Sequence, residues 1–598
     1  MVLTNYVNQR SFGIILLFAF VTLYSKANTY SIAPKEVASW STSAIMAYNR
    51  TQSQSEVIWK SIVHLNTSDI LRSDILQIEL DHSSIEVRSL YRNEEGTYSY
   101  IHFISADNLS DVYVSVLDSH IDVSIHTEHA VYTLTDISEN EGLLAKYEFE
   151  DIPEEPENMG EITIPQTTKF TNEPKIQIPG VPLGTSFIRV LMLYTNSSLS
   201  QMPYFPFNGS STDRMRMMAY EYINKANESF ANSYISAHLQ LAYLGATDYN
   251  ESNHTWTESL NYFCANSDGY MDEVHALRDK YAADICILFI DIPSNCGEVY
   301  EIQATDNTAF CMVYPGTGCF NKFSAIHEIG HIVGCRHNMY HDNTLTPYQY
   351  GHGYCPYIPD NGLSRWRTMM AYTNRWCENN ENNCKRILYW SNPLVSYNSM
   401  ETGTIYYENN ARVWNERASI VSTFRTKSDS ITLTAYDNNA FSLYESYEAE
   451  ETITAGAGYE IQSGQTIDMV AANHIHFLPG THIKAGSTFR ASISHHADGT
   501  PYPQFTPERN ENNALQSHSI YISPNPVTDV LTFRSTESMT QVRIYNLSGQ
   551  CVLSTQTTIP SSLPSNLQMD VSTLPVGLYL LQAKTADGAT LQTKFIKK

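Results

Sequence analysis

Three histidines, a glutamate and two glycines lie within residues 327–337, and the spacing of this stretch constrains the fold more than that of any other. The sequence there reads HEIGHIVGCRH. On an α-helix, His327 and His331 lie one turn apart on one face, so both imidazoles can reach a single metal ion. Gly334 lets the backbone turn through dihedral angles that side chains resist, which brings His337 round as a third ligand. Three neutral nitrogens and one open position predict a catalytic zinc site.

Glu328 follows the first of these histidines. Its carboxylate is therefore expected to lie beside the metal, where a general base for a zinc-bound water must be. The alternative is a packed helix whose histidines face solvent, and Ile329, Ile332 and Val333 do provide a packed side. The full pattern arises by chance in about one of 15,000 chains of this composition, which favours the metal site.

A second motif follows about 30 residues later, where residues 367–372 read RTMMAY. We expect Met370 to form an apolar floor beneath the metal. The pattern HExxHxxGxxH with a later methionine turn resembles the metzincin metallopeptidases. The runs ADICILFID, FSAIHEIGHIVG and RILYWSNP resemble the bacterial adamalysin or reprolysin-like branch, and the resemblance covers residues 187–426.

The resemblance assigns roles by position. It implies one catalytic zinc ion with three ligands and a general base, namely His327, His331, His337 and Glu328. It makes Met370 the Met-turn residue. Met370 and Gly334 are expected to support the structure of the site. Tyr372 resembles the residue that several metzincin branches use to stabilise the tetrahedral oxyanion, and a packed tyrosine is the alternative.

Three further features of the sequence can be compared with the reprolysin-like branch. Asn338 stands where an aspartate usually follows the third ligand. Cys335 lies inside the motif, and we expect a disulfide there because three histidines already complete the metal site. The run TAFCMVY at 308–314 resembles the sheet-edge strand along which these enzymes align an extended substrate.

The chain around the motif predicts an α/β domain. Residues 187–195 and 283–291 are continuous apolar runs that suit central strands covered on both faces. Residues 213–231 and 271–281 have helical spacing. By resemblance these elements belong to a metzincin catalytic domain at 181–427, a twisted mixed sheet with an active-site helix.

The N-terminal region predicts export and latency. Arg10 precedes an apolar run at 12–24 and small residues up to Ala27, so 1–27 is expected to be a signal peptide. Residues 28–180 are expected to form a β-rich propeptide with an acidic, proline-rich linker that is cleaved on activation. This propeptide holds no cysteine, which excludes a thiolate cap on the metal and leaves a carboxylate or steric block.

Nine of the ten cysteines fall between residues 264 and 384. In an oxidising compartment such clustering predicts disulfides. Because nine is odd, at least one thiol is free or pairs outside this stretch.

Two all-β modules are predicted after the catalytic domain. At 428–515 apolar residues recur about every six positions before a polar linker, which fits a β-solenoid or a plain sandwich. At 516–598 the runs SPNPVTDVLTF, VRIYNLSGQCV, LPVGLYLLQA and KFIKK resemble the C-terminal sorting domain of type IX secretion. Such a domain is recognised by the secretion machinery and removed. Without the resemblance it is a small β-sandwich binding module.

The predicted fold class is therefore multidomain: an α/β metzincin catalytic domain flanked by a β-rich propeptide and C-terminal all-β modules. The predicted function is a secreted zinc-dependent endopeptidase acting on proteins or peptides. It would be released or attached to the cell surface after crossing both membranes of a Gram-negative bacterium. The alternative is a surface adhesin or binding protein with a metzincin-like scaffold.

Composition limits the kinds of partner that this chain is expected to bind. A net charge of −26 repels phosphate backbones and argues against nucleic-acid binding. No apolar stretch beyond the signal is long enough to span a bilayer, so no transmembrane helix is expected in the mature form. A peptidyl-Asp preference, known in a neighbouring bacterial group, and a bound Ca²⁺ ion both stay open as alternatives.

Overall fold

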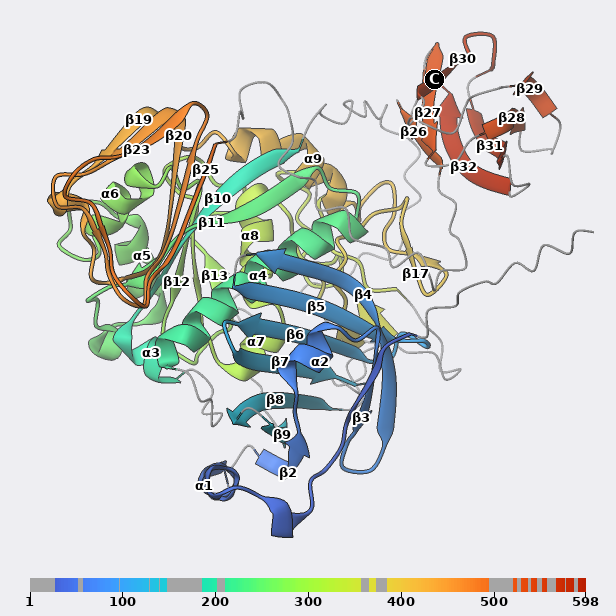
Figure 1. Ribbon diagram of the computed structural model, residues 1–598. Helices are drawn as coiled ribbons and strands as arrows, with labels where there is room; N and C mark the ends of the chain where they lie inside the picture. Colours follow the sequence, from blue (N-terminus) through green and yellow to red (C-terminus); the bar gives the residue numbers. More distant parts are fainter. Residues whose placement is uncertain are drawn as a thin grey trace, which may run out of the picture.

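The computed structural model describes most of the chain outside its N-terminus and connecting segments (Figure 1). The described ranges are 27–51, 57–95, 97–127, 130–138, 140–147, 185–201, 210–356, 365–372, 384–493 and most of 520–597. Residues 1–26 of the predicted signal peptide and both predicted linkers lie outside these ranges. Among the described residues, no helix is long and apolar enough to cross a membrane.

The described residues up to 147 form a nine-stranded sheet that curls into a near-barrel, together with two short helices. Its order is β1-β3-β4-β5-β6-β7-β8-β9-β2, antiparallel except for β1 with β3. The ends of the sheet meet because Lys35, just after β1, donates its backbone N–H to the Ile62 carbonyl of β2 at 2.8 Å. The elements are β1 (Thr29–Ile32), α1 (Thr42–Thr51), β2 (Val57–His64), α2 (Thr67–Leu71), β3 (Ile75–Glu79), β4 (Ser84–Glu95), β5 (Tyr98–Ser105), β6 (Asp111–Leu117), β7 (His120–His126), β8 (Val131–Ser138) and β9 (Glu141–Tyr147).

The histidine motif lies in a mixed α/β region whose sheet has the order β13-β14-β12-β10-β11. β13 is antiparallel to β14 and the other pairs are parallel. The elements are β10 (Ser186–Tyr194), α3 (Asn196–Gln201), α4 (Ser211–Asn232), β11 (Ala237–Ala246), α5 (Trp256–Cys264), α6 (Glu273–Lys280), β12 (Ile285–Phe289), β13 (Gly297–Val299), β14 (Phe310–Val313), α7 (Thr317–Asn321), α8 (Ser324–Val333) and α9 (Asn410–Val421). The strands β10 and β12 and the helices α4 and α6 confirm the sequence prediction.

Both faces of this sheet are covered, which explains the continuous apolar runs. Along β10, Ile188 and Val190 pack with α4 and α8 on one face. Leu191 and Leu193 pack with α5 and α6 on the other. The histidine-bearing helix α8 is thereby held against one face of the sheet by its own apolar side.

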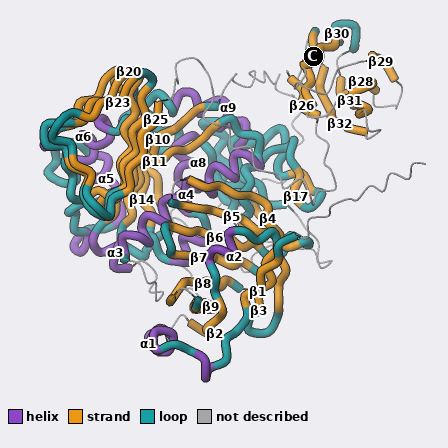
Figure 2. Tube along the Cα trace, in the orientation of Figure 1, coloured by secondary structure: helices purple, strands orange, loops and turns teal. Residues whose placement is uncertain are grey.

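The strands after residue 428 extend the same sheet and also stack as coils, visible as the layered strands in Figure 2. β20 pairs antiparallel with β11, where Leu244 lies opposite Tyr444. Tyr444 then pairs in parallel with Thr466, and Thr466 with Thr488, a step of 22 residues each time. A constant step between parallel strands is the geometry of a β-solenoid. The strands are β19 (Ser428–Leu433), β20 (Ser442–Ala455), β21 (Glu460–Ile461), β22 (Thr466–Ala471), β23 (His474–Phe477), β24 (His482–Ile483) and β25 (Thr488–Ile493).

The strands beyond residue 520 form two sheets, β26-β27-β30 and β29-β28-β31-β32. Leu531 from the first sheet packs in one core with Val542 and Leu581 from the second, so this part is a β-sandwich. The strands are β26 (Ile520–Ser523), β27 (Val530–Ser535), β28 (Met539–Tyr545), β29 (Cys551–Gln556), β30 (Asn566–Asp570), β31 (Gly577–Thr585) and β32 (Thr590–Lys597).

The prediction that residues 308–314 form the edge strand of the sheet is wrong, because the edge is the neighbouring strand. These residues form β14, which lies between β12 and β13. The terminal strand is β13, folded back antiparallel with Glu298 opposite Met312. The sequence pattern favoured β14 because this strand is an apolar run, and its four residues are all buried. β13 is short and partly exposed, so it gives a weaker pattern.

Candidate metal centre

The three predicted metal ligands converge on one point. His327 and His331 lie one turn apart on α8, which ends at Gly334 with a φ of 114°. The Nε2 atom of His337 is 3.1 Å from that of His327 and 3.0 Å from that of His331. All three imidazoles are buried. Zinc bonds of about 2.0–2.1 Å in a tetrahedral site place nitrogens about 3.3 Å apart, so these residues fit such an ion.

Backbone carbonyls fix which ring nitrogen is available. The Nδ1 atom of His327 lies 2.9 Å from the Met369 carbonyl oxygen, and that of His331 lies 2.8 Å from the Cys335 carbonyl oxygen. A carbonyl only accepts, so each Nδ1 carries the proton and donates it. Nε2 of both rings is then left as an unprotonated ligand atom, oriented before any metal binds.

Glu328 is 1% exposed and lies against the terminal strand β13. A Cβ atom built on Gly297 of that strand would be only 2.4 Å from the Glu328 Oε1 atom. Glycine at this position therefore lets the strand approach the carboxylate closely. The carboxylate lies between α8 and the edge of the sheet, one residue from a predicted ligand.

The methionine turn lies directly beneath α8. Met369 donates its backbone N–H to the Tyr389 carbonyl at 2.8 Å, and Ala371 donates its own to the Thr368 carbonyl at 3.0 Å. The Met370 side chain is fully buried. A Cβ atom built on Gly330 of α8 would lie 2.4 Å from its Sδ atom, so this glycine makes room for the turn.

Tyr372 stacks on the third histidine. Its ring centroid is 4.0 Å from that of His337, with 27° between the planes. Its backbone N–H donates to the Asn338 Oδ1 atom at 3.0 Å. The asparagine that departs from the usual pattern thus supplies the acceptor oxygen that an aspartate would also offer.

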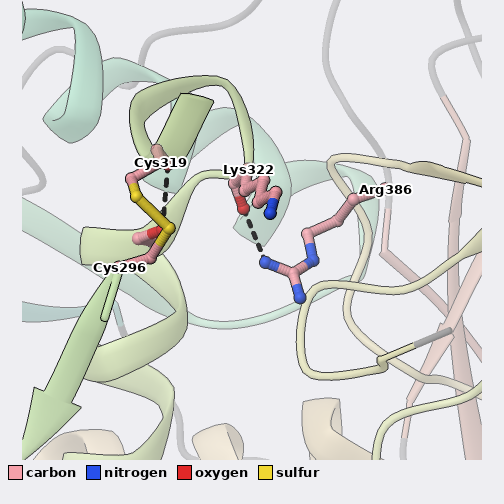
Figure 3. Close-up of a disulfide and its surroundings, with 5 residues drawn as sticks. Cys296, Cys319, Lys322 and Arg386 are labelled. Atoms are coloured by element: carbon pink, nitrogen blue, oxygen red, sulfur yellow. Dashed lines mark hydrogen bonds between the residues drawn. A yellow bond between two sulfur atoms is a disulfide. The ribbon is translucent and has the colours of Figure 1, made fainter. Parts of the chain in front are cut away.

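Two buried arginines tie the turn to the start of α8. The Arg386 side chain donates to the Lys322 carbonyl at 2.6 Å and to the Ala371 carbonyl at 3.2 Å. Arg367 donates to the same Ala371 carbonyl at 3.0 Å. Figure 3 shows the first of these bonds beside a disulfide. Arg367 and Arg386 end the paired strands β15 (Arg365–Arg367) and β16 (Cys384–Arg386).

The disulfide joins Cys296 to Cys319, with an S–S length of 2.01 Å (Figure 3). It anchors the residue before β13 to α7, the short helix that precedes α8. This bond confirms the prediction that the cysteines between residues 264 and 384 form disulfides.

The disulfide expected at Cys335 is wrong. Cys335 is a free, fully buried thiol in the core that α4, α8 and α9 share. Its side chain fills apolar space instead of reaching another cysteine. Burial raises the pKa of this thiol well above its ordinary value, which keeps it protonated.

A metal site of three histidines on a helix and the turn after it, with a glutamate beside the first, is the arrangement of zinc metallopeptidases. Comparison with known families agrees, since residues 185–384 match the family described as Metallo-peptidase family M12. Residues 519–598 match the Secretion system C-terminal sorting domain, which marks the chain for export. The chain belongs to metallopeptidase family M12.

Four relatives carry the name peptidyl-Asp metalloendopeptidase. The relative from Stenotrophomonas maltophilia is 36% identical over 265 residues, covering 42% of this chain and 58% of the relative. That from Xanthomonas campestris pv. campestris is 30% identical over 298 residues, 49% of this chain and 65% of its own. That from Pseudomonas fragi is 31% identical over 173 residues, 29% of this chain and 85% of its own. The chain thus spans less than two thirds of the first two relatives.

Proposed function

We propose that this chain is a secreted, zinc-dependent endopeptidase that hydrolyses peptide bonds in proteins. The observation that carries the proposal is the convergence of three buried Nε2 atoms within a family M12 fold. Imidazole nitrogen is a preferred zinc ligand, and three protein ligands leave one position open for catalysis. This complete, preorganised set of ligands favours the enzyme over the alternative of a binding protein built on the same scaffold.

His327, His331 and His337 would hold the ion. Zinc supplies Lewis-acid chemistry when bound: it acidifies water and polarises a carbonyl. Glu328, as general base, accepts the proton of the attacking water on a carboxylate oxygen and passes it to the departing amide nitrogen. Its burial between α8 and Gly297 keeps bulk water from competing for that proton.

β13 is proposed to align the substrate. It is the terminal strand of the sheet, so an extended peptide can add to its outer side by backbone hydrogen bonds. Such a peptide would pass next to Glu328, because Gly297 lies against that carboxylate. The substrate backbone is therefore positioned by the same strand that packs on the general base.

Tyr372 and Met370 are proposed to act in different ways. The tyrosine ring stacked on His337 is near enough to the site for its hydroxyl to stabilise an oxyanion. Met370 is a support that keeps the turn in place beneath the histidines, and Gly334 is the helix end that allows His337 to return.

We propose that the preferred substrates carry an aspartate beside the cleaved bond. The support for this choice is that the relatives are named peptidyl-Asp metalloendopeptidases.

The N-terminal near-barrel is proposed to be a propeptide, removed by cleavage between residues 148 and 184, after Lys169 or Lys175. It packs close to the metal centre, because Tyr113 and His126 contact the Phe323 ring just before α8. We propose that latency is steric. The sorting domain is proposed to carry the enzyme across both membranes of a Gram-negative bacterium, to be released or kept at the cell surface.

Replacing Glu328 by glutamine tests the proposal. Glu328→Gln should keep one zinc ion per chain and lower the rate of peptide hydrolysis at least about 1,000-fold, since the general base is lost. Glu301→Gln, at an exposed glutamate bonded to Thr308, is the matched control and should match the parent chain. An undiminished rate in Glu328→Gln would overturn the assignment of the base and of the site.

A further inference from the structure

Helix α4 lies between two sheets, the N-terminal near-barrel and the α/β sheet (Figure 1). Its apolar side chains pack on the α/β sheet, namely Met215, Ala219, Ile223, Ala226 and Phe230. Its other face is polar and charged yet also buried, with Arg214, Glu221, Asn224, Lys225 and Glu228. That face is covered by β5, β6 and β7 of the near-barrel.

Polar side chains of the near-barrel pair with these groups. Asp122 lies 3.2 Å from Arg214, and Ser115 donates to Glu221 at 3.0 Å. Tyr98, Tyr113 and Leu117 of the near-barrel also share an apolar core with α4, so the contact is mixed. An obligate interface is more uniformly apolar. The charged part of this contact can be exposed to water, which suits two parts that can come apart.

His102 of β5 is the centre of this contact. Its Nδ1 atom is 2.5 Å from Glu228 Oε1 on α4, and its Nε2 atom is 3.1 Å from Asp111 Oδ1 on β6. Carboxylate oxygens only accept, so both ring nitrogens donate and the ring is a cation. Tyr100 also donates to Glu228, at 3.0 Å, and Lys385 of the α/β region pairs with Asp111.

Two cations and two carboxylates therefore balance across the contact, with His102 only 4% exposed. Loss of the imidazolium proton would leave Glu228 and Asp111 buried with one cation between them. Burial of a carboxylate without its partner is costly. Attachment of the near-barrel is thus tied to the charge on one side chain.

We propose that the near-barrel stays bound to the charged face of α4 as a non-covalent subunit after the connecting segment is cut. Protonated His102 holds the two parts together. The proposal rests on the propeptide role given above. It does not depend on whether the metal centre hydrolyses peptides.

The sign of the pH dependence follows from the same geometry. Burial lowers the pKa of His102, but Glu228 and Asp111 outweigh it and raise this pKa from 6.5 to about 9. Affinity is therefore highest below pH 6.5 and falls as the pH rises through 9. Asp111 stays beside His102 in the detached near-barrel, so only the part of this rise that Glu228 causes is lost on detachment; one pKa unit corresponds to a loss of about 10-fold in affinity.

Other titratable groups at the contact do not reverse this sign between pH 6.5 and 9. Burial raises the pKa of the neighbouring tyrosines, so they stay neutral; these are Tyr91, Tyr100, Tyr113, Tyr389 and Tyr397. Burial lowers the pKa of His126 to about 3, and the cations Lys225 and Lys385 lie beside Glu221 and Asp111. Burial raises the pKa of Asp122 to about 6, despite Arg214, and this also favours attachment in acid.

The test uses the full chain with a specific protease site placed between residues 148 and 184. After cutting, sedimentation at pH 6.5 to 9.5 reports whether the two pieces travel together, with no activity needed. We expect one species at pH 6.5 and a dissociation constant at least about 10-fold higher at pH 9.5.

Glu228→Gln removes the charge from the α4 side and should weaken attachment at pH 6.5 and flatten its pH dependence. The matched control is His120→Gln, because His120 of β7 bonds to Asp136 within the near-barrel itself; it should follow the parent curve. A dissociation constant that does not change with pH would overturn the proposal. So would a Glu228→Gln variant that keeps the steep parental dependence.

Discussion

Replacing Gly330 by alanine sets two effects on stability against each other. Gly330 lies inside α8, where alanine is the better helix former by about 1 kcal/mol. The added methyl group, however, would lie 2.4 Å from Met370 Sδ and 2.8 Å from the Trp390 ring. Both neighbours are fully buried, so neither can turn out into solvent.

The steric effect should win. Forcing a methyl group into a packed core costs about 1–3 kcal/mol, which leaves a net loss of up to about 2 kcal/mol after the gain in helix propensity. The methionine turn must shift away from α8, and it carries the Met369 carbonyl that accepts from His327. Weakening such a supporting bond lowers metal affinity about 10- to 100-fold.

Urea unfolding followed by tryptophan fluorescence measures the first effect, and competition with a zinc chelator measures the second. Adding Met370→Ala to Gly330→Ala removes the side chain that the methyl group meets, so the two changes should cost less together than their sum. If Gly330→Ala were as stable as the parent and bound zinc equally well, the close packing of α8 on the turn would be refuted.

Three further predictions concern the same centre. In the folded chain, thiol reagents at pH 8 should leave Cys335 unmodified, because burial raises its pKa, and rapid labelling would contradict this placement. Asn338→Asp should keep an acceptor for the Tyr372 N–H and retain activity, whereas Asn338→Leu should lose about 5- to 10-fold in peptide hydrolysis for one lost hydrogen bond. X-ray absorption at the zinc edge should show nitrogen neighbours at about 2.0–2.1 Å; a sulfur neighbour at about 2.3 Å would contradict a site made only of histidines.

The metal ligands could be predicted because their placement is local. The spacing of His327 and His331 sets one helix face, and a glycine turn accounts for His337. Gly297 and Gly330 were missed because their role depends on segments that meet only in the folded chain. Gly330 did carry a signal, since a glycine inside an apolar helix lowers its propensity and often has a packing reason.

The remaining differences have the same origin in long-range contacts. Periodicity predicted coils after residue 428, but the pairing of Leu244 with Tyr444 joins them to the α/β sheet, and no local pattern records that pairing. Strand order also decided the edge of the sheet, because β13 folds back outside β14. The Cys335 prediction fails because spacing does not show whether a second cysteine comes within bonding distance in the folded chain, where this thiol is free and packed in the apolar core.

Zinc titration tests the central claim most directly. The chain is cut between residues 148 and 184, the near-barrel is removed, and the enzyme is stripped of metal and supplied with zinc in steps while peptide hydrolysis is followed. Hydrolysis should be absent without metal, rise in proportion to bound zinc and level off at one ion per chain, as expected for the one group of three ligands among the described residues, His327, His331 and His337. Full hydrolysis in the stripped enzyme, or none at one bound zinc ion, would contradict the account.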